Sequence, residues 1–126
     1  MKLNHLNLTV DDVPAAQGIF ETYFGLTTVL NREDDFAAMY DDNGSVLTLM
    51  KGKKVSYPGT FHVGFMQESE ERVNEINRRL KDDGFEVKPP GRFHGSWTFY
   101  FQAPGGLTIE VLGDDSRQYD PGETAR

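Results

Sequence analysis

The chain has 126 residues, which fits one compact domain, and it carries a formal net charge of −7. Its hydrophobic content of 37%, with nine Phe, five Tyr and one Trp, is enough to bury a core without covalent cross-links. The absence of cysteine excludes disulfides, thiolate metal sites and cysteine nucleophiles, so any metal must be held by His and carboxylate side chains. The acidic balance and the lack of a basic stripe argue against a nucleic-acid partner.

The first dozen residues alternate between apolar and polar types and turn acidic, without the apolar core of a signal peptide. No apolar run in the chain approaches the length of a membrane span. We therefore expect a cytoplasmic protein with no membrane partner.

The first half predicts a strand, a helix and three further strands. Residues 3–10 alternate with the period of a half-buried strand. Asp11 or Asp12 then caps a helix that has Pro14 in its first turn and ends at Gly25. The short strands expected next span about 26–32, 35–41 and 45–51, with an Asp-Asn-Gly turn at 42–44.

The same order of elements returns after a Tyr-Pro-Gly break at 57–59. Residues 60–66 form a strand, and Ser69 caps a second helix that ends at Gly84. The strands expected after it span about 85–88, 96–102 and 107–112. Aligning the halves matches His5 with His62, and Thr48 with Glu110.

A βαβββ unit that cannot bury its apolar face alone must pair with another such unit. The sequence therefore predicts an α+β fold in which two paired βαβββ modules form a cupped mixed sheet. The single domain covers residues 1–113, with the first module at about 1–52 and the second at about 57–113. Residues 114–126 are polar and predict a C-terminal tail.

Alternation places three polar residues, His5, His62 and Glu110, on the strand faces opposite the apolar side chains, and Tyr100 faces the same way. Two imidazoles and a carboxylate suffice to hold a divalent metal with open positions. A histidine in a strand is more often only a satisfied polar residue. Glu110, between two apolar neighbours, favours the metal because a desolvated carboxylate needs a cationic partner. The sequence predicts one divalent ion per site, with Fe, Mn, Ni and Zn left open.

Three segments resemble the vicinal oxygen chelate superfamily: NHLNLTVDD, FHVGF and FYFQAPGGLTIEV. This superfamily includes glyoxalase I, bleomycin-resistance proteins, fosfomycin-resistance proteins and extradiol dioxygenases, and the resemblance covers roughly residues 1–113. It implies a cupped sheet around a metal, commonly in a homodimer, with ligand positions at His5, Thr48, His62 and Glu110. Glyoxalase I has a carboxylate or amide at the second position, so the hydroxyl here makes the set resemble that of the dioxygenases and fosfomycin enzymes. Whether Thr48 contributes stays open.

The closing segment resembles the extradiol signature, which places a Tyr before the last ligand, as Tyr100 stands here ten residues before Glu110. That signature also has an upstream histidine, and His94 lies about one residue short of its spacing. Tyr100 and His94 are therefore the candidate catalytic residues, as proton donor or acceptor. For a phosphonate substrate, Lys88 and Arg92 are available, although the segment around them also reads as a solvated loop.

The leading expectation is a divalent-metal-dependent enzyme that binds two oxygens of a small substrate, with extradiol-dioxygenase-like and glyoxalase- or lyase-like chemistry both open. The alternative is a metal-free protein that sequesters a small molecule, as bleomycin-resistance proteins do. A third is a regulatory or structural member with a vestigial site. Because each half leaves an open four-stranded sheet with exposed edges, we expect a homodimer. The cup forms either within one chain or across two.

Overall fold

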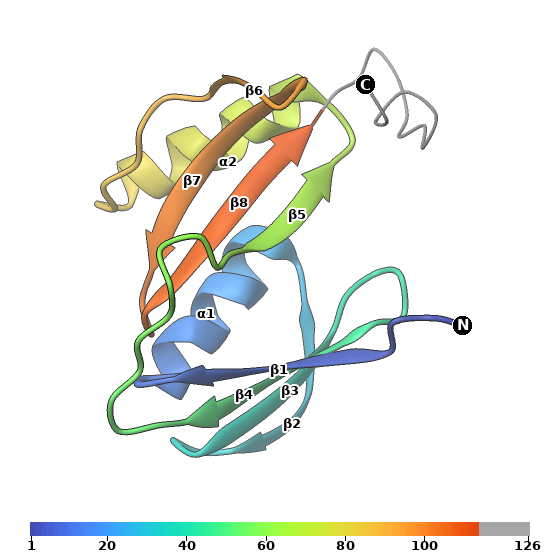
Figure 1. Ribbon diagram of the computed structural model, residues 1–126, viewed down its shortest axis with the longest axis vertical. Helices are drawn as coiled ribbons and strands as arrows, with labels where there is room; N and C mark the ends of the chain where they lie inside the picture. Colours follow the sequence, from blue (N-terminus) through green and yellow to red (C-terminus); the bar gives the residue numbers. More distant parts are fainter. Residues whose placement is uncertain (114–126) are drawn as a thin grey trace. The chain divides into compact units, whose positions relative to one another are not determined.

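The computed structural model describes residues 1–113 and contains two four-stranded sheets, each accompanied by one helix (Figure 1). The predicted tail at 114–126 lies outside the described residues. The described residues divide into two compact units, one made of residues 1–63 with 102–108 and the other of residues 64–101 with 109–113. The prediction of two βαβββ modules is confirmed. Neither helix of the described part is long and apolar enough to cross a membrane.

The first module begins at the positions that its local chemistry predicts. The Asp12 side chain caps the first helix by accepting a hydrogen bond from the Ala15 amide, and Gly25 ends it with a φ of 69°. Strand β1 pairs in parallel with β4, and the sheet order is β1-β4-β3-β2. The elements are β1 (His5–Val10), α1 (Val13–Phe24), β2 (Thr27–Arg32), β3 (Phe36–Tyr40) and β4 (Val46–Lys51).

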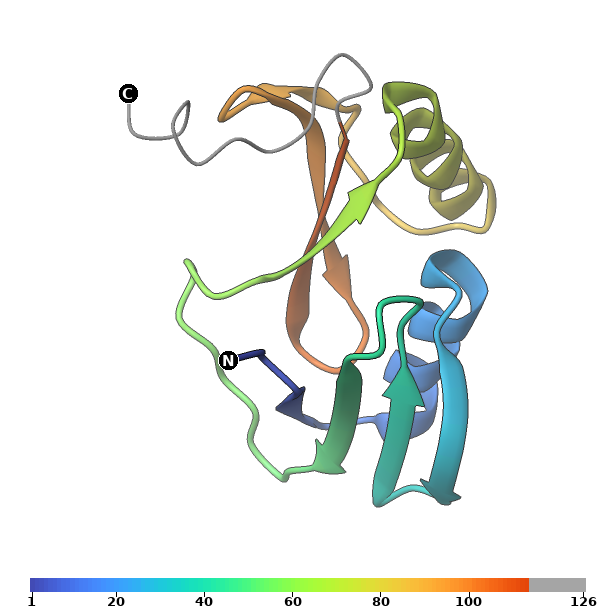
Figure 2. The ribbon, with the colours of Figure 1, turned by 90° about the vertical axis from the view of Figure 1, so that its right-hand side faces the viewer.

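Helix α1 covers one face of this sheet (Figure 2). The apolar side chains of that face and of α1 form the core, because alternate residues of each strand point to the same side. Those at most 1% exposed are Leu8, Val10, Val13, Ala16, Phe20, Ala37, Met39 and Leu49. The residues between them on the strands, His5 among them, lie on the face that α1 does not cover.

The second module has the sheet order β5-β8-β7-β6. Its helix is capped by Ser69, which accepts a hydrogen bond from the Arg72 amide, as predicted. The elements are β5 (Val63–Gln67), α2 (Glu70–Asp82), β6 (Gly91–Phe93), β7 (Ser96–Ala103) and β8 (Leu107–Gly113). The apolar residues of α2, β7 and β8 that are at most 2% exposed are Val73, Ile76, Leu80, Phe99, Phe101, Leu107, Ile109 and Val111.

The prediction of a strand at residues 85–88 is wrong. These residues form no strand, and the short strand β6 begins only at Gly91. Pro89 and Pro90 explain the shift, because a residue without a backbone N–H cannot donate to a sheet ladder. The segment before them is held instead by Asn77 of α2, which donates a hydrogen bond to the Lys88 carbonyl over 2.8 Å.

Gly105, in the turn between β7 and β8, lies close to Val10 and Ala16 of the first unit because it has no side chain. Gly105 has a φ of 95°, and a Cβ there would stand 3.0 Å from the Val10 Cβ and 3.4 Å from the Ala16 Cβ. We expect Gly105→Ala to lower the free energy of unfolding by about 2–5 kcal/mol, since the left-handed backbone costs roughly 1–2 kcal/mol and overpacking about 1–3 kcal/mol. The measurement is urea unfolding.

Gly44→Ala is the matched control for this prediction. Gly44 has a similar φ of 82°, but nothing in the described part of the chain lies within 4 Å of a Cβ placed there. The control therefore carries the backbone strain alone. Equal losses in the two variants would contradict the packing role of Gly105.

Candidate functional site

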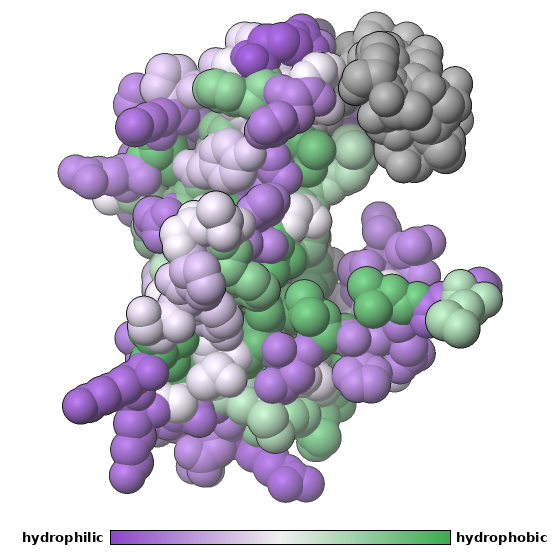
Figure 3. Space-filling view, in the orientation of Figure 1, coloured by the Kyte–Doolittle hydropathy of each residue, from purple (hydrophilic) through white to green (hydrophobic). Residues whose placement is uncertain are grey.

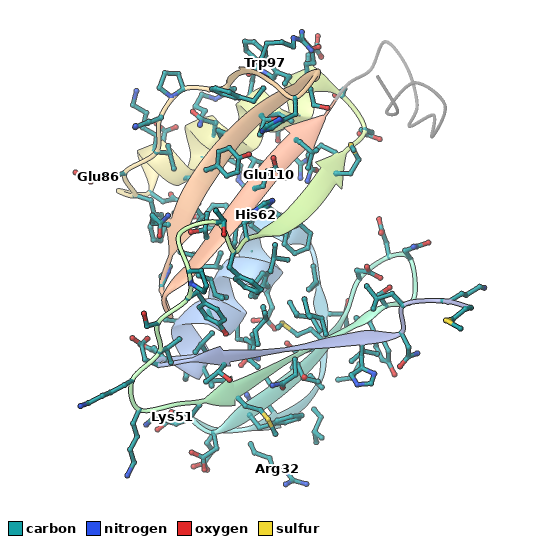
Figure 4. All side chains as sticks on the ribbon, in the orientation of Figure 1. Arg32, Lys51, His62, Glu86, Trp97 and Glu110 are labelled. Atoms are coloured by element: carbon teal, nitrogen blue, oxygen red, sulfur yellow. The ribbon has the colours of Figure 1, made fainter. Side chains whose placement is uncertain are left out.

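Glu110 and Tyr100 form a hydrogen-bonded pair on the second sheet. Glu110 lies on β8 between Ile109 and Val111, which are both fully buried on the side of α2. Its carboxylate lies on the opposite, open face and is partly buried. The Tyr100 hydroxyl on the neighbouring strand β7 donates to Glu110 Oε2 over 2.9 Å. Figure 4 shows Glu110 on the middle of its sheet.

Tyr100 is the protonated partner of this pair. The side chain is 38% exposed. Partial burial, followed by the hydrogen bond and the negative charge of Glu110, raises the pKa of the Tyr100 phenol above its ordinary value. The phenol therefore keeps its proton at neutral pH and orients the carboxylate.

Gly64 on β5 leaves space for that carboxylate. A Cβ at Gly64 would stand 3.2 Å from Glu110 Oε1, tighter than ordinary van der Waals contact. Alternation in the sequence puts Gly64 on the open face, but its approach to Glu110 follows from the pairing of β5 with β8, which no local pattern gives. The close approach of Gly64 to the carboxylate is therefore a feature that the sequence pattern did not reveal.

His62 immediately precedes β5, because the strand begins at Val63 and not at residue 60 as predicted. Its Nδ1 lies 2.9 Å from the Thr60 carbonyl oxygen. With the proton on Nδ1 this contact is a hydrogen bond, and Nε2 then carries the lone pair that a metal needs.

The segment before His62 is anchored to the edge of the first sheet. The Tyr57 hydroxyl accepts a hydrogen bond from the Thr9 amide over 2.9 Å and donates to the Thr9 carbonyl over 2.7 Å. The Tyr57 ring also stacks on Phe61, with ring centroids 4.5 Å apart. A single phenol thus satisfies both outward backbone groups of one residue of β1.

His5 is exposed at the start of β1, where its Nδ1 lies 3.1 Å from Asn4 Oδ1. On the same strand face, the Thr48 hydroxyl donates to Asn7 Oδ1 over 2.7 Å. Thr48 therefore has a hydrogen-bonding role beside the predicted ligand.

The predicted ligands are divided between the two units: His5 and His62 belong to the first and Glu110 to the second. Within the described part of the chain, no three His, Asp or Glu side chains gather closely enough to hold a metal ion. The structure locates each predicted ligand within its own unit. That His5, His62 and Glu110 meet at one metal ion stays a prediction.

His94 lies in the turn of a tight hairpin. Phe93 pairs with Ser96, so His94 and Gly95 form a two-residue connection with φ angles of 53° and 80°. Positive φ at both residues is typical of a type I′ turn. Ser96, next to this turn, and Tyr100 are roughly 13 Å apart along β7, at about 3.3 Å per residue.

A catalytic role for His94 stays a prediction. Turnover by His94→Asn would test it, because Asn tolerates the positive φ of this position.

Arg92, one of the two cations considered for a phosphonate, lies on the helix side of the second sheet. Its guanidinium binds Glu70 of α2 over 2.8 Å and lies 5.4 Å from the centre of the Trp97 ring. The Trp97 N–H in turn donates to Asn74 of α2 over 2.7 Å. Trp97, labelled in Figure 4, therefore faces the helix, and it holds Arg92 there.

The family model of the Glyoxalase/Bleomycin resistance protein/Dioxygenase superfamily matches residues 2–111. The chain belongs to this superfamily. A solved structure described as a possible glyoxalase from Bacillus cereus is 61% identical, with a TM-score of 0.84, and the match covers 89% of this chain and 98% of that chain. The resemblance to the vicinal oxygen chelate superfamily is thereby confirmed.

Two solved structures of lower identity share the fold of this chain. Lactoylglutathione lyase from Agrobacterium tumefaciens is 20% identical, with a TM-score of 0.74 and coverage of 94% of this chain and 97% of that one. A mutant of the fosfomycin resistance protein FosX from Listeria monocytogenes, complexed with Mn(II) and a dihydroxypropylphosphonic acid, is 22% identical, with a TM-score of 0.74 and coverage of 88% of both chains. No curated protein matches this chain.

Proposed function

We propose that this superfamily member is a divalent-metal-dependent enzyme that acts on a small oxygen-bearing substrate by bidentate chelation. Extradiol-dioxygenase-like and glyoxalase- or lyase-like chemistry both fit the proposal. The observation that carries it is the Tyr100–Glu110 pair, in which a partly buried carboxylate on the open sheet face is oriented by a protonated phenol. Keeping a carboxylate partly desolvated is costly, and a cation offsets that cost.

The proposed ligands are His5, His62 and Glu110, and their donor set suits Fe, Mn, Ni or Zn. The contact of His62 Nδ1 with the Thr60 carbonyl supports a ligand role, because metal-binding imidazoles are commonly held through their second nitrogen. The Mn(II) complex of FosX supports a divalent ion in this superfamily. When bound, the metal would supply Lewis-acid polarisation of the substrate oxygens or, as iron, the activation of dioxygen.

Tyr100 is the proposed proton donor or acceptor beside the substrate. Its hydroxyl oxygen lies 2.9 Å from Glu110 Oε2 and donates its proton to that hydrogen bond, and the raised pKa keeps the proton on Tyr100 until a stronger base develops nearby. We assign the role to Tyr100 and not to His94, because the length of β7 separates the hairpin turn from the carboxylate pair.

We further propose a homodimer. β1 and β5 are edge strands of their sheets, and exposed edges favour pairing with another strand. The outer edge of β1 is covered at Thr9 by Tyr57, which leaves its His5 end for such pairing. We expect light scattering to give the mass of a dimer at tens of micromolar protein. A monomer at that concentration would contradict this assembly.

The function is tested on protein purified without chelators. Elemental analysis and calorimetry with Fe(II), Mn(II), Ni(II) and Zn(II) should show one ion per site. Oxygen uptake with catechols and consumption of a glutathione hemithioacetal then separate the two reaction classes, and only metal-loaded protein should turn over.

The runner-up function is metal-free sequestration of a small molecule. It is favoured by the apolar side chains exposed on the first sheet, among them Leu30, Tyr40 and Met50. If the protein takes up no metal and binds an apolar ligand tightly, sequestration replaces the enzyme as the proposed function.

A further inference from the structure

The turn between β3 and β4 contains the one Asn-Gly pair of the chain. Asparagine is among the thermolabile residue types. Of the six asparagines, Asn43 alone precedes a glycine, and each of the others precedes a residue with a side chain. A side chain on the next residue crowds the peptide nitrogen that follows an asparagine, whereas Gly44 leaves that nitrogen accessible. The sequence therefore singles out Asn43 for a reaction between its side chain and the backbone.

The Asn43 side chain also differs from those of the other asparagines in its hydrogen bonding. Each of the other five has a side-chain atom within 2.7–3.1 Å of a hydrogen-bonding partner. The five are Asn4, Asn7, Asn31, Asn74 and Asn77, and their partners are His5, Thr48, Gln17, Trp97 and the Lys88 carbonyl, in that order. Within residues 1–113, the Asn43 side chain is exposed and makes no hydrogen bond, although its backbone N–H donates one.

The backbone of this turn is held by Asp41. Its Oδ1 accepts hydrogen bonds from the amides of Asn43 and Ser45 over 2.9 and 2.8 Å. Gly44 has a φ of 82°, and nothing in the described residues lies within 4 Å of a Cβ placed there. Figure 3 shows hydrophilic side chains at the surface where this turn projects in Figure 1. Water therefore reaches the turn, and no neighbouring group fills the space around Gly44.

We propose that Asn43 is a site of spontaneous deamidation, with water as the co-reactant. The Gly44 backbone nitrogen attacks Cγ of Asn43, so that a new C–N bond closes a succinimide ring and the Cγ–Nδ2 bond breaks. Ammonia leaves with the proton of the Gly44 amide. One water molecule then opens the ring at either carbonyl, which gives aspartate or isoaspartate without oxidation or reduction. The reaction needs neither a metal nor a substrate, so it does not depend on the function proposed above.

Both products disturb the turn and the strands that it joins. Aspartate adds a third consecutive carboxylate after Asp41 and Asp42, and like charges at adjacent positions repel each other. Isoaspartate also adds a methylene group to the main chain, so the two turn amides no longer both reach Asp41 Oδ1. Val46, which begins β4 directly after the turn, pairs with Tyr40 of β3 and with His5 of β1. The modification therefore loosens the adjoining ends of these three strands.

The test incubates the intact protein in mildly alkaline buffer, because the attack needs a deprotonated peptide nitrogen. Peptide mapping by mass spectrometry locates the exchange of an amide NH₂ for OH, and fragmentation separates isoaspartate from aspartate. We expect Asn43 to convert before any other asparagine, and at a rate similar to that in the same chain unfolded in urea. Conversion in urea alone, or earlier conversion at another asparagine, would overturn the proposal.

Asn43→Gln is the matched control, because it keeps an amide at this position but would have to close a larger ring, which forms more slowly. It should show no conversion over the same time. Hydrogen exchange of β1, β3 and β4 and the melting temperature measure the consequence. Incubated wild type should exchange faster at these strand ends and melt lower than fresh protein, whereas Asn43→Gln should not change. Equal exchange and melting of fresh and converted wild type would overturn the structural effect assigned to the modification.

Discussion

Glu110→Gln is expected to keep the fold and to weaken divalent-metal binding by about 100-fold or more. The amide has nearly the same shape and still accepts the Tyr100 hydrogen bond, so the sheet loses little. The variant removes the one anionic ligand that faces a dication in a partly desolvated environment. Changes to groups that merely support a ligand already cost about 10–100-fold in metal affinity, so the loss of the ligand charge should cost at least as much.

Glu86→Gln is the control, because it removes an equal charge from an exposed residue in the segment after α2 (Figure 4). Calorimetric titration with Mn(II), Ni(II) and Zn(II) compares both variants with the wild type, and thermal unfolding of the metal-free proteins is measured beside it. If Glu110 only anchors a polar network, Glu110→Gln will shift the melting temperature and leave metal affinity as it was. That outcome would contradict a ligand role.

Gly64→Ala should weaken metal binding by roughly tenfold without touching a ligand, in the range found for other supporting groups. The added methyl group would stand 3.2 Å from Glu110 Oε1, so the carboxylate must move by a few tenths of an ångström. A ligand oxygen displaced by that distance no longer meets the metal at its preferred geometry. The same titrations measure the effect, and circular dichroism confirms that the sheet persists.

Gly59→Ala provides the comparison for this variant, because nothing in the described residues lies within 4 Å of a Cβ at Gly59. It makes the same chemical change in the segment between the modules. Indistinguishable metal affinities for the two glycine variants would show that the space beside Glu110 has no bearing on the site.

The parts of the fold that the sequence predicts well are those set by local chemistry. Asp12, Gly25 and Ser69 delimit the helices through caps that involve only neighbouring backbone groups. The strand predicted at 85–88 is wrong although its cause is local, because Pro89 and Pro90 cannot donate to a sheet ladder and β6 begins only at Gly91. The tight turn at His94 depends instead on the pairing of β6 with β7.

The candidate site shows the same division between local and long-range information. Alternation correctly assigns Tyr100 and Glu110 to one face, because a strand has a period of two. The space beside Gly64 depends on which strands are neighbours, which a local pattern does not encode. The proposed convergence of His5, His62 and Glu110 would depend on how the modules pair, which no local pattern gives either.

X-ray absorption spectroscopy of the zinc-loaded protein tests the proposed metal site most directly. We predict two imidazole nitrogens and at least one carboxylate oxygen at about 2.0–2.2 Å. His5→Ala and His62→Ala should each remove one imidazole from the shell, and Glu110→Gln should alter its oxygen component. A shell of water oxygens, or one that stays the same in all three variants, would contradict the assignment of His5, His62 and Glu110 as the ligands.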